Sequence, residues 1–100
     1  MLDNFRTYQI SKSFYSTCKT LRLPRHLKDQ LSRSSSSVCL NVAEGAGRDT
    51  PADQRRFYTI AFASLRESQA VLDLELGPTH QANVLADKLA AHLYRLIHGR

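Results

Sequence analysis

The stretch Ser34–Arg48, with the sequence SSSSVCLNVAEGAGR, is the part of the chain that says most about its structure. Through it, small and apolar residues recur at steps of three and four, the spacing that places side chains on one face of a helix: Leu27, Leu31, Ser35, Val38, Val42 and Gly45. The side chains on this face become smaller along the helix, from leucines to serine, valine and glycine, so we expect a partner helix to come unusually close near Asn41 and Glu44. Serine runs are typical of flexible linkers, but the apolar stripe continues on both sides of this one. The helix is expected to end at Gly45 and Gly47.

A helix is also predicted before this stretch, from about Asn4 to Leu21. Its apolar stripe consists of Ile10, Phe14, Cys18 and Leu21. Pro24 breaks the chain and fits the first turn of the following helix, where its missing N–H donor has no consequence. Two short antiparallel helices are therefore expected here.

Two further helices follow the stretch. Thr50 is expected to cap the third helix, with Pro51 at its first position and Asp53 facing the helix dipole. Gly77-Pro78 stops this helix, the longest of the four, and Thr79 opens the last one. The last helix is predicted to face the core through Val84, Leu85, Leu89, Leu93, Leu96 and Ile97. Together these helices predict an all-α fold, an antiparallel up-and-down four-helix bundle that forms a single domain over residues 1–100.

Composition restricts the class of protein. Hydrophobic residues make up 42% and aromatic residues 8% of the 100 residues, which favours an aliphatic core. Cys18 and Cys39 are too few for a disulfide framework or a zinc site and are expected to be buried thiols in a reducing compartment. Asp3, Asn4 and Arg6 interrupt any leader, and no apolar run reaches the roughly 20 residues of a membrane span. A cytoplasmic protein that contacts no membrane is expected.

The charge is uneven along the chain. The segment through Arg48 holds eight basic and three acidic residues, whereas the remainder holds six of each, so the formal net charge of +5 lies in the first half. On the first helix, Tyr8, Lys12, Tyr15 and Lys19 alternate cations with rings, a pattern that suits phosphates and unpaired bases. Alternatively, the tyrosines pack against a neighbouring subunit and the lysines are merely solvated. We predict a nucleic-acid-binding surface made of six cations: Lys12, Lys19, Arg22, Arg25, Lys28 and Arg33.

No catalytic, metal or cofactor site is expected. Glu44 and Glu67 are predicted inside or at the edge of the bundle with Asn41 and Ser64, but a di-iron bundle needs histidine three residues after glutamate, where Gly47 and Ala70 stand. The four histidines have no ligand spacing, and the glycines form no phosphate loop. We interpret the two carboxylates as structural groups that pair with arginines such as Arg48 or Arg66, or accept backbone donors, and determine which helices meet.

Two blocks of this sequence resemble a known family. Gln30–Ser34, Ser37-Val38, Asn41–Gly45 and Gly47-Arg48 form the first block, and Phe57, Ile60-Ala61 and Ser64-Leu65-x-Glu67 form the second. They are similar to the signature of the 23S rRNA intervening-sequence proteins, a four-helix-bundle family that includes the accessory variability protein of diversity-generating retroelements. The resemblance assigns a structural motif to eight positions: Ser37, Asn41, Glu44, Gly45, Gly47, Arg48, Ser64 and Glu67.

Two classes of function follow. The resemblance implies a small accessory protein that acts as a homo-oligomeric, pentameric ring, binds nucleic acid and assists a reverse transcriptase, and the basic first half supports nucleic-acid binding physically. The other class is a homo-oligomeric protein-interaction scaffold without nucleic-acid activity. Apolar positions on more than one helix face favour self-association in both cases, since a lone bundle would leave them exposed.

Overall fold

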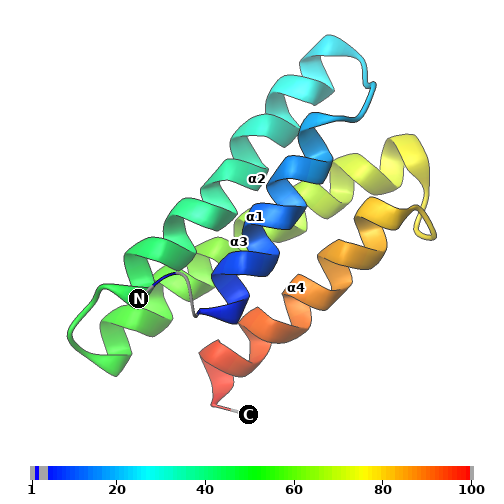
Figure 1. Ribbon diagram of the computed structural model, residues 1–100. Helices are drawn as coiled ribbons and strands as arrows, with labels where there is room; N and C mark the ends of the chain where they lie inside the picture. Colours follow the sequence, from blue (N-terminus) through cyan, green and yellow to red (C-terminus); the bar gives the residue numbers. More distant parts are fainter. Residues whose placement is uncertain (1, 3–4, 100) are drawn as a thin grey trace.

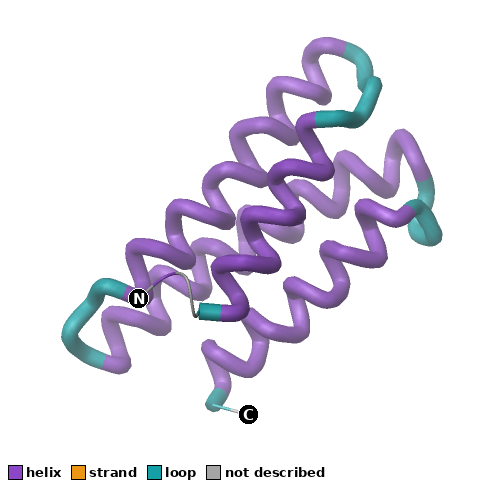
Figure 2. Tube along the Cα trace, viewed as in Figure 1, coloured by secondary structure: helices purple, strands orange, loops and turns teal. Residues whose placement is uncertain are grey.

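Four antiparallel helices form the molecule, which was analysed as a computed structural model that describes residue 2 and residues 5–99 (Figure 1). They are α1 (Arg6–Lys19), α2 (Arg25–Ala46), α3 (Pro51–Leu76) and α4 (Gln81–His98). Short connections join them, and no strand occurs among the described residues (Figure 2). The predicted all-α four-helix bundle is confirmed.

Each helix packs mainly against two others. α2 contacts α1 and α3, and α4 contacts α3 and α1, so the helices follow one another around the bundle in chain order. The α1–α2 and α3–α4 connections lie at one end, whereas the α2–α3 connection lies at the other end with the chain termini (Figure 1). The bundle is elongated, with extents of 40 × 22 × 21 Å.

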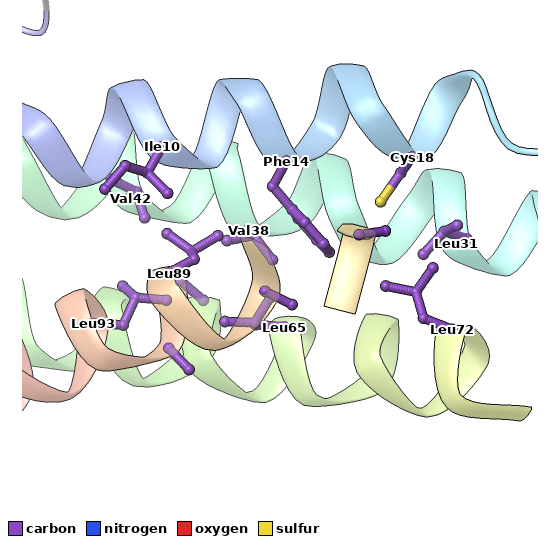
Figure 3. Packing of buried hydrophobic residues seen from close by; sticks show 14 of the residues in the cluster. Ile10, Phe14, Cys18, Leu31, Val38, Val42, Leu65, Leu72, Leu89 and Leu93 are labelled. Atoms are coloured by element: carbon purple, nitrogen blue, oxygen red, sulfur yellow. The ribbon is translucent and has the colours of Figure 1, made fainter. Parts of the chain in front are cut away.

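The core is mainly aliphatic, with Cys18 and the rings of Phe14 and Tyr58 among its members, and Phe14 is fully buried between the helices (Figure 3). The stripe predicted for α1 is confirmed, although Leu21 is only half-buried. The prediction for α4 was wrong at Val84, whose side chain is 58% exposed. The stripe that α4 buries instead runs through Ala82, Ala86, Leu89 and Leu93, so small alanines hold the first turns of α4 close to its neighbours.

The α3 boundaries agree with the sequence. The side chain of Thr50 accepts a hydrogen bond of 3.1 Å from the Asp53 N–H, and Pro51 begins the helix. Gly77 ends it with a φ of 85°, in the left-handed region that favours glycine. The prediction that Thr79 opens α4 was wrong, because Nδ1 of His80 caps the helix by accepting from the Ala82 N–H at 3.0 Å.

The first helical hairpin differs slightly from its prediction. The expected start near Asn4 lies outside the described residues, and α1 is helical from Arg6. α1 ends at Lys19 rather than Leu21, and at its end the backbone N–H and the hydroxyl of Thr20 both donate to the Thr17 carbonyl, the hydroxyl at 2.7 Å. Pro24 immediately precedes α2 instead of lying in its first turn, with an extended ψ of 143°.

Candidate nucleic-acid interface

The contact between α2 and α3, called the α2–α3 seam below, brings the two helices together at Gly45. A Cβ atom at Gly45 would lie 2.6 Å from Cε1 and 2.9 Å from Cδ1 of the buried Tyr58 ring. Only glycine therefore permits this approach. The expectation that Gly45 ends the helix was wrong, because α2 continues to Ala46 and Gly47 alone follows its end. Burial in the seam also raises the pKa of the Tyr58 phenol.

Serine pairs join the two helices above this contact. The hydroxyl oxygens of Ser37 and Ser64 lie 2.8 Å apart, and those of Ser34 and Ser68 lie 2.7 Å apart. Asn41 donates to both the carbonyl and the hydroxyl of Ser37, at 2.9 and 3.1 Å. Because buried polar groups are costly unless they are paired, these bonds select one alignment of α2 against α3.

The two glutamates of the motif do not lie in the seam. Both are exposed, because they fall beside the buried stripes rather than on them. Glu44 pairs with Arg48 at 2.6 Å as expected, but this ion pair lies at the end of one helix and does not determine which helices meet. Arg66 donates to Gln69 at 2.8 Å instead of pairing with Glu67.

Arg48 links the motif to the second sequence block through its guanidinium. Its central carbon lies 4.5 Å from the centroid of the Phe57 ring, and Arg56 lies at the same distance from that ring. Cations at this range are attracted to the ring. The motif residues therefore contribute to the contact between α2 and α3 and to the end of α2. They do not form an acid–base pair.

The aromatic and basic residues of α1 are arranged as the sequence indicated. Nζ of Lys12 lies 5.5 Å from the ring centroid of Tyr8, and Nζ of Lys19 lies 5.0 Å from that of Tyr15. Both lysines are exposed and both tyrosines are half-buried. Each tyrosine ring thus holds a lysine side chain along the helix surface, and the ammonium group of the lysine faces solvent.

The strongest grouping of predicted cations occurs where α1 passes into α2. Lys19 and Lys28 line a pocket of about 240 Å³ together with Cys18 and Ser32. Lys28 is fixed there because its Nζ donates to the Leu21 carbonyl at 3.1 Å. Arg22 in the connection and Arg25 at the start of α2 are both exposed. We call the four cations Lys19, Arg22, Arg25 and Lys28 the basic junction.

None of the six predicted cations forms an ion pair with any residue that the structure describes. The described carboxylate nearest to the junction in sequence, Asp29, is exposed and likewise unpaired. Lys12 and Arg33 are exposed but lie outside the junction, because Lys12 lies two turns before Lys19 and Arg33 lies beyond Lys28 on α2. Arg22 and Arg25 belong to the junction by their place in the connection and at the start of α2, since only Lys19 and Lys28 line the pocket. The junction therefore presents positive charge that the protein itself does not neutralise.

The cysteines and histidines contribute no reactive group to this surface. Both thiols are free and buried, as expected, and burial raises the pKa of Cys18 to about 12. Burial also raises the pKa of Cys39, against the opposing influence of Ser11 and Lys12. Burial, followed by the charges of Arg95, Arg6 and Lys88, lowers the pKa of His92. No three potential metal ligands gather among the described residues.

Sequence reasoning missed two features. Ser32 and Cys18 complete the junction pocket, although their spacing gave no sign of it. A larger groove between α3 and α4, lined partly by Tyr94 and Phe62, was also missed. The sequence signal for this groove was the exposed aromatic residue in α4. A groove depends on how two helices meet, so it cannot be predicted from either helix alone.

These features define a class of protein: a small antiparallel helical bundle with a polar, glycine-tightened seam and an unneutralised basic flank. None of the helices in the described part has an apolar stretch that could cross a membrane. The family model of the 23S rRNA-intervening sequence protein matches residues 5–98. The chain belongs to this family, as the two sequence blocks predicted. No curated protein and no solved structure matches it significantly.

Proposed function

We propose that the protein is a nucleic-acid-binding accessory protein that holds a phosphate backbone at the basic junction. The observation that carries the proposal is the absence of ion pairs, within the described residues, from Lys19, Arg22, Arg25 and Lys28. Cations that no carboxylate of the protein neutralises can contact phosphates, and such contacts release counterions from a nucleic acid. The tyrosines beside Lys12 and Lys19 add ring faces to the same flank.

The matching experiment is a salt titration with labelled single-stranded, duplex and RNA–DNA hybrid oligonucleotides. Replacing Lys19, Arg22 and Arg25 with glutamine removes three charges and spares Lys28, which bonds the Leu21 carbonyl. The log-log salt slope is expected to flatten by roughly 2 for a single strand, at roughly 0.7 per phosphate contact. Binding is expected to weaken for every sequence tested, because phosphate contacts carry no base information.

Arg6→Gln is the control for net charge, since Arg6 is an exposed cation at the opposite end of α1 from the junction. It is compared with the single variant Lys19→Gln, which removes the same charge from the junction. Equal losses from the two substitutions would contradict the assignment of the site. A wild type that binds no oligonucleotide at about 0.15 M salt, where exposed charges are screened beyond about 8 Å, would contradict the function itself.

Assistance to a reverse transcriptase is the more specific form of this proposal and has its support in the sequence resemblance. It predicts that a reverse transcriptase encoded beside the gene binds this protein. Co-purification of the two proteins, repeated with the junction variant, tests it. An absence of any such neighbouring gene would leave the protein as a nucleic-acid-binding protein of another system.

A second candidate is a homo-oligomeric scaffold, and the outer face of α2 favours it. Leu40 is 69% exposed on this face and borders an open pocket of about 610 Å³ that is also lined by Ala43, Glu44, Gly47 and Arg48. Nε of Arg48 is buried without a hydrogen-bond partner in the described structure. A second copy docked on this face would cover the leucine, and self-association is also compatible with nucleic-acid binding.

Light scattering tests the self-association, for which the resemblance implies a pentameric ring. The mass is expected to be a multiple of 11.3 kDa and to fall in Leu40→Asp. Leu74→Asp is the matched control, because Leu74 is a comparably exposed leucine, at 75%, on α3. A mass of one chain for the wild type at micromolar concentration would contradict the ring.

A further inference from the structure

A groove between α3 and α4 lies away from the basic junction, toward the end of the bundle that holds the chain termini. Its volume is about 520 Å³, within the roughly 300–1,000 Å³ that is usual for ligand sites. We call it the α3–α4 groove and define it by its lining residues: Thr59, Phe62, Arg66, Tyr94, Ile97 and His98.

The groove is walled by rings. Tyr94 is 49% exposed, although it is a large aromatic residue, and its ring centroid lies 4.2 Å from that of His98. The guanidinium carbon of Arg66 lies 4.7 Å from the centroid of the Phe62 ring on the other wall. Arg66 is also held by its 2.8 Å bond to Gln69. An apolar slot with aromatic walls and a positioned cation has the chemistry of a site for a flat, anionic ligand.

The residues that line the groove include no carboxylate. The α3 segment 54–66 and the α4 segment 88–98 carry five cations and two histidines: Arg55, Arg56, Arg66, Lys88, Arg95, His92 and His98. Carboxylates flank these segments at Asp53, Glu67 and Asp87, and Asp73 and Asp87 line a second pocket together with Arg66. The lining of the groove is thus basic, and acidic residues flank it in the sequence.

The cations are spread along the groove rather than clustered at one point. On α3, Arg55, Thr59, Phe62 and Arg66 recur at steps of four and three and so share one face. Eleven residues separate the two arginines, which corresponds to about 16 Å along the helix axis. A chain with repeated negative charges can therefore contact a cation on each side of the aromatic slot.

We infer that the α3–α4 groove binds an unpaired nucleobase of a single-stranded nucleic acid, with the base stacked on Tyr94 and the adjoining phosphates beside Arg66 and Arg55. This inference rests on the proposed function and adds a second contact surface to it. A base fits better than an apolar helix, because the walls are aromatic and the rim is basic. The site would make the protein prefer single strands to duplexes, whose bases are stacked on one another.

The test compares wild type, Tyr94→Ala and Tyr94→Phe on a labelled single-stranded RNA without self-complementarity and on the duplex of the same sequence. Loss of one stacked base corresponds to a weakening of about 5- to 150-fold, and it is expected for Tyr94→Ala on the single strand alone. Tyr94→Phe keeps a ring and is expected to bind like wild type. The salt slope is expected to stay unchanged in both variants, because no phosphate contact is removed.

The other outcomes separate this inference from the proposed function. If Tyr94→Ala and wild type bind the single strand equally well, while the junction variant loses duplex binding, base binding in the groove is overturned. The proposed function stands in that case. Equal weakening of single strand and duplex would also overturn it. A fall in oligomeric mass for Tyr94→Ala would show that a second copy covers the groove. A wild type that binds neither RNA would overturn both proposals.

Discussion

The α2–α3 seam and the α3–α4 groove use the same helix, α3, in opposite ways. In the seam, serines and Gly45 bring the backbones so close that hydroxyl pairs join them at 2.7 and 2.8 Å. Along the groove, Phe62 and Tyr94 line a space of about 520 Å³ that the protein leaves open. The size of the side chains at the contact therefore determines whether two helices pack closely or leave an open groove between them.

Of the substitutions that test this contrast, Gly45→Leu is expected to lower the free energy of unfolding most. The new Cβ would lie only 2.6 Å from Cε1 of Tyr58, so overpacking should lower the free energy of unfolding by about 1–3 kcal/mol or more. Ser37→Leu, beside the Ser64 hydroxyl, should fall in the same range. Urea denaturation monitored by circular dichroism provides the measurement.

Gly47→Ala is the matched control for Gly45. A Cβ at Gly47 would meet only carbonyl oxygens at 3.7 and 3.9 Å, and its φ of −90° suits any residue. The free energy of unfolding should stay constant or rise by up to about 1 kcal/mol. An equal loss at both glycines would contradict the close approach at Gly45, because Ala and Leu favour a helix more than Gly and helix propensity alone would not lower stability.

The buried Ser34–Ser68 pair should give the next largest effect. Ser34→Ala or Ser68→Ala leaves one hydroxyl without its partner across the seam, so each should lower the free energy of unfolding by about 1 kcal/mol. The double variant should lose less than the sum, because either single variant already breaks the bond between the two hydroxyls. Strict additivity in this cycle would show that the hydroxyls do not bond across the seam.

The smallest change in the free energy of unfolding is expected at the connection between α3 and α4. His80→Ala removes the cap of α4 and should lower the free energy of unfolding by about 0.5–1 kcal/mol. Thr79→Ala should change it by less than about 0.5 kcal/mol, since Thr79 is exposed and does not cap the helix. The opposite ranking in thermal unfolding would restore threonine as the cap.

The seam was far more predictable from sequence than the groove. The stripe through Val38, Val42 and Gly45 is local, because residues three and four apart must share a helix face whatever else the chain does. The same logic located the helix stop at Gly77 and the Thr50 cap. It also placed the predicted basic residues of α1 on one exposed face.

Sequence reasoning failed where a side chain's surroundings depended on a second helix. Val84 matches an apolar period in the first turn of α4, yet alanines fill the space beside it and leave it outside. Glu44 and Glu67 do not share the period of the buried stripes of α2 and α3, and both are exposed. The choice between Thr79 and His80 depended on the turn geometry after Gly77.

The short connections have a consequence for the speed of folding. Three of the four helix–helix contacts join neighbours in the chain, and only the contact between α1 and α4 spans most of its length. Bundles with such local contacts fold within about microseconds to milliseconds. We expect α2 and α3 to pair early and α1 to dock on α4 late, so Ser68→Ala should slow folding, whereas truncation of Leu93 on α4 should chiefly accelerate unfolding in a stopped-flow experiment.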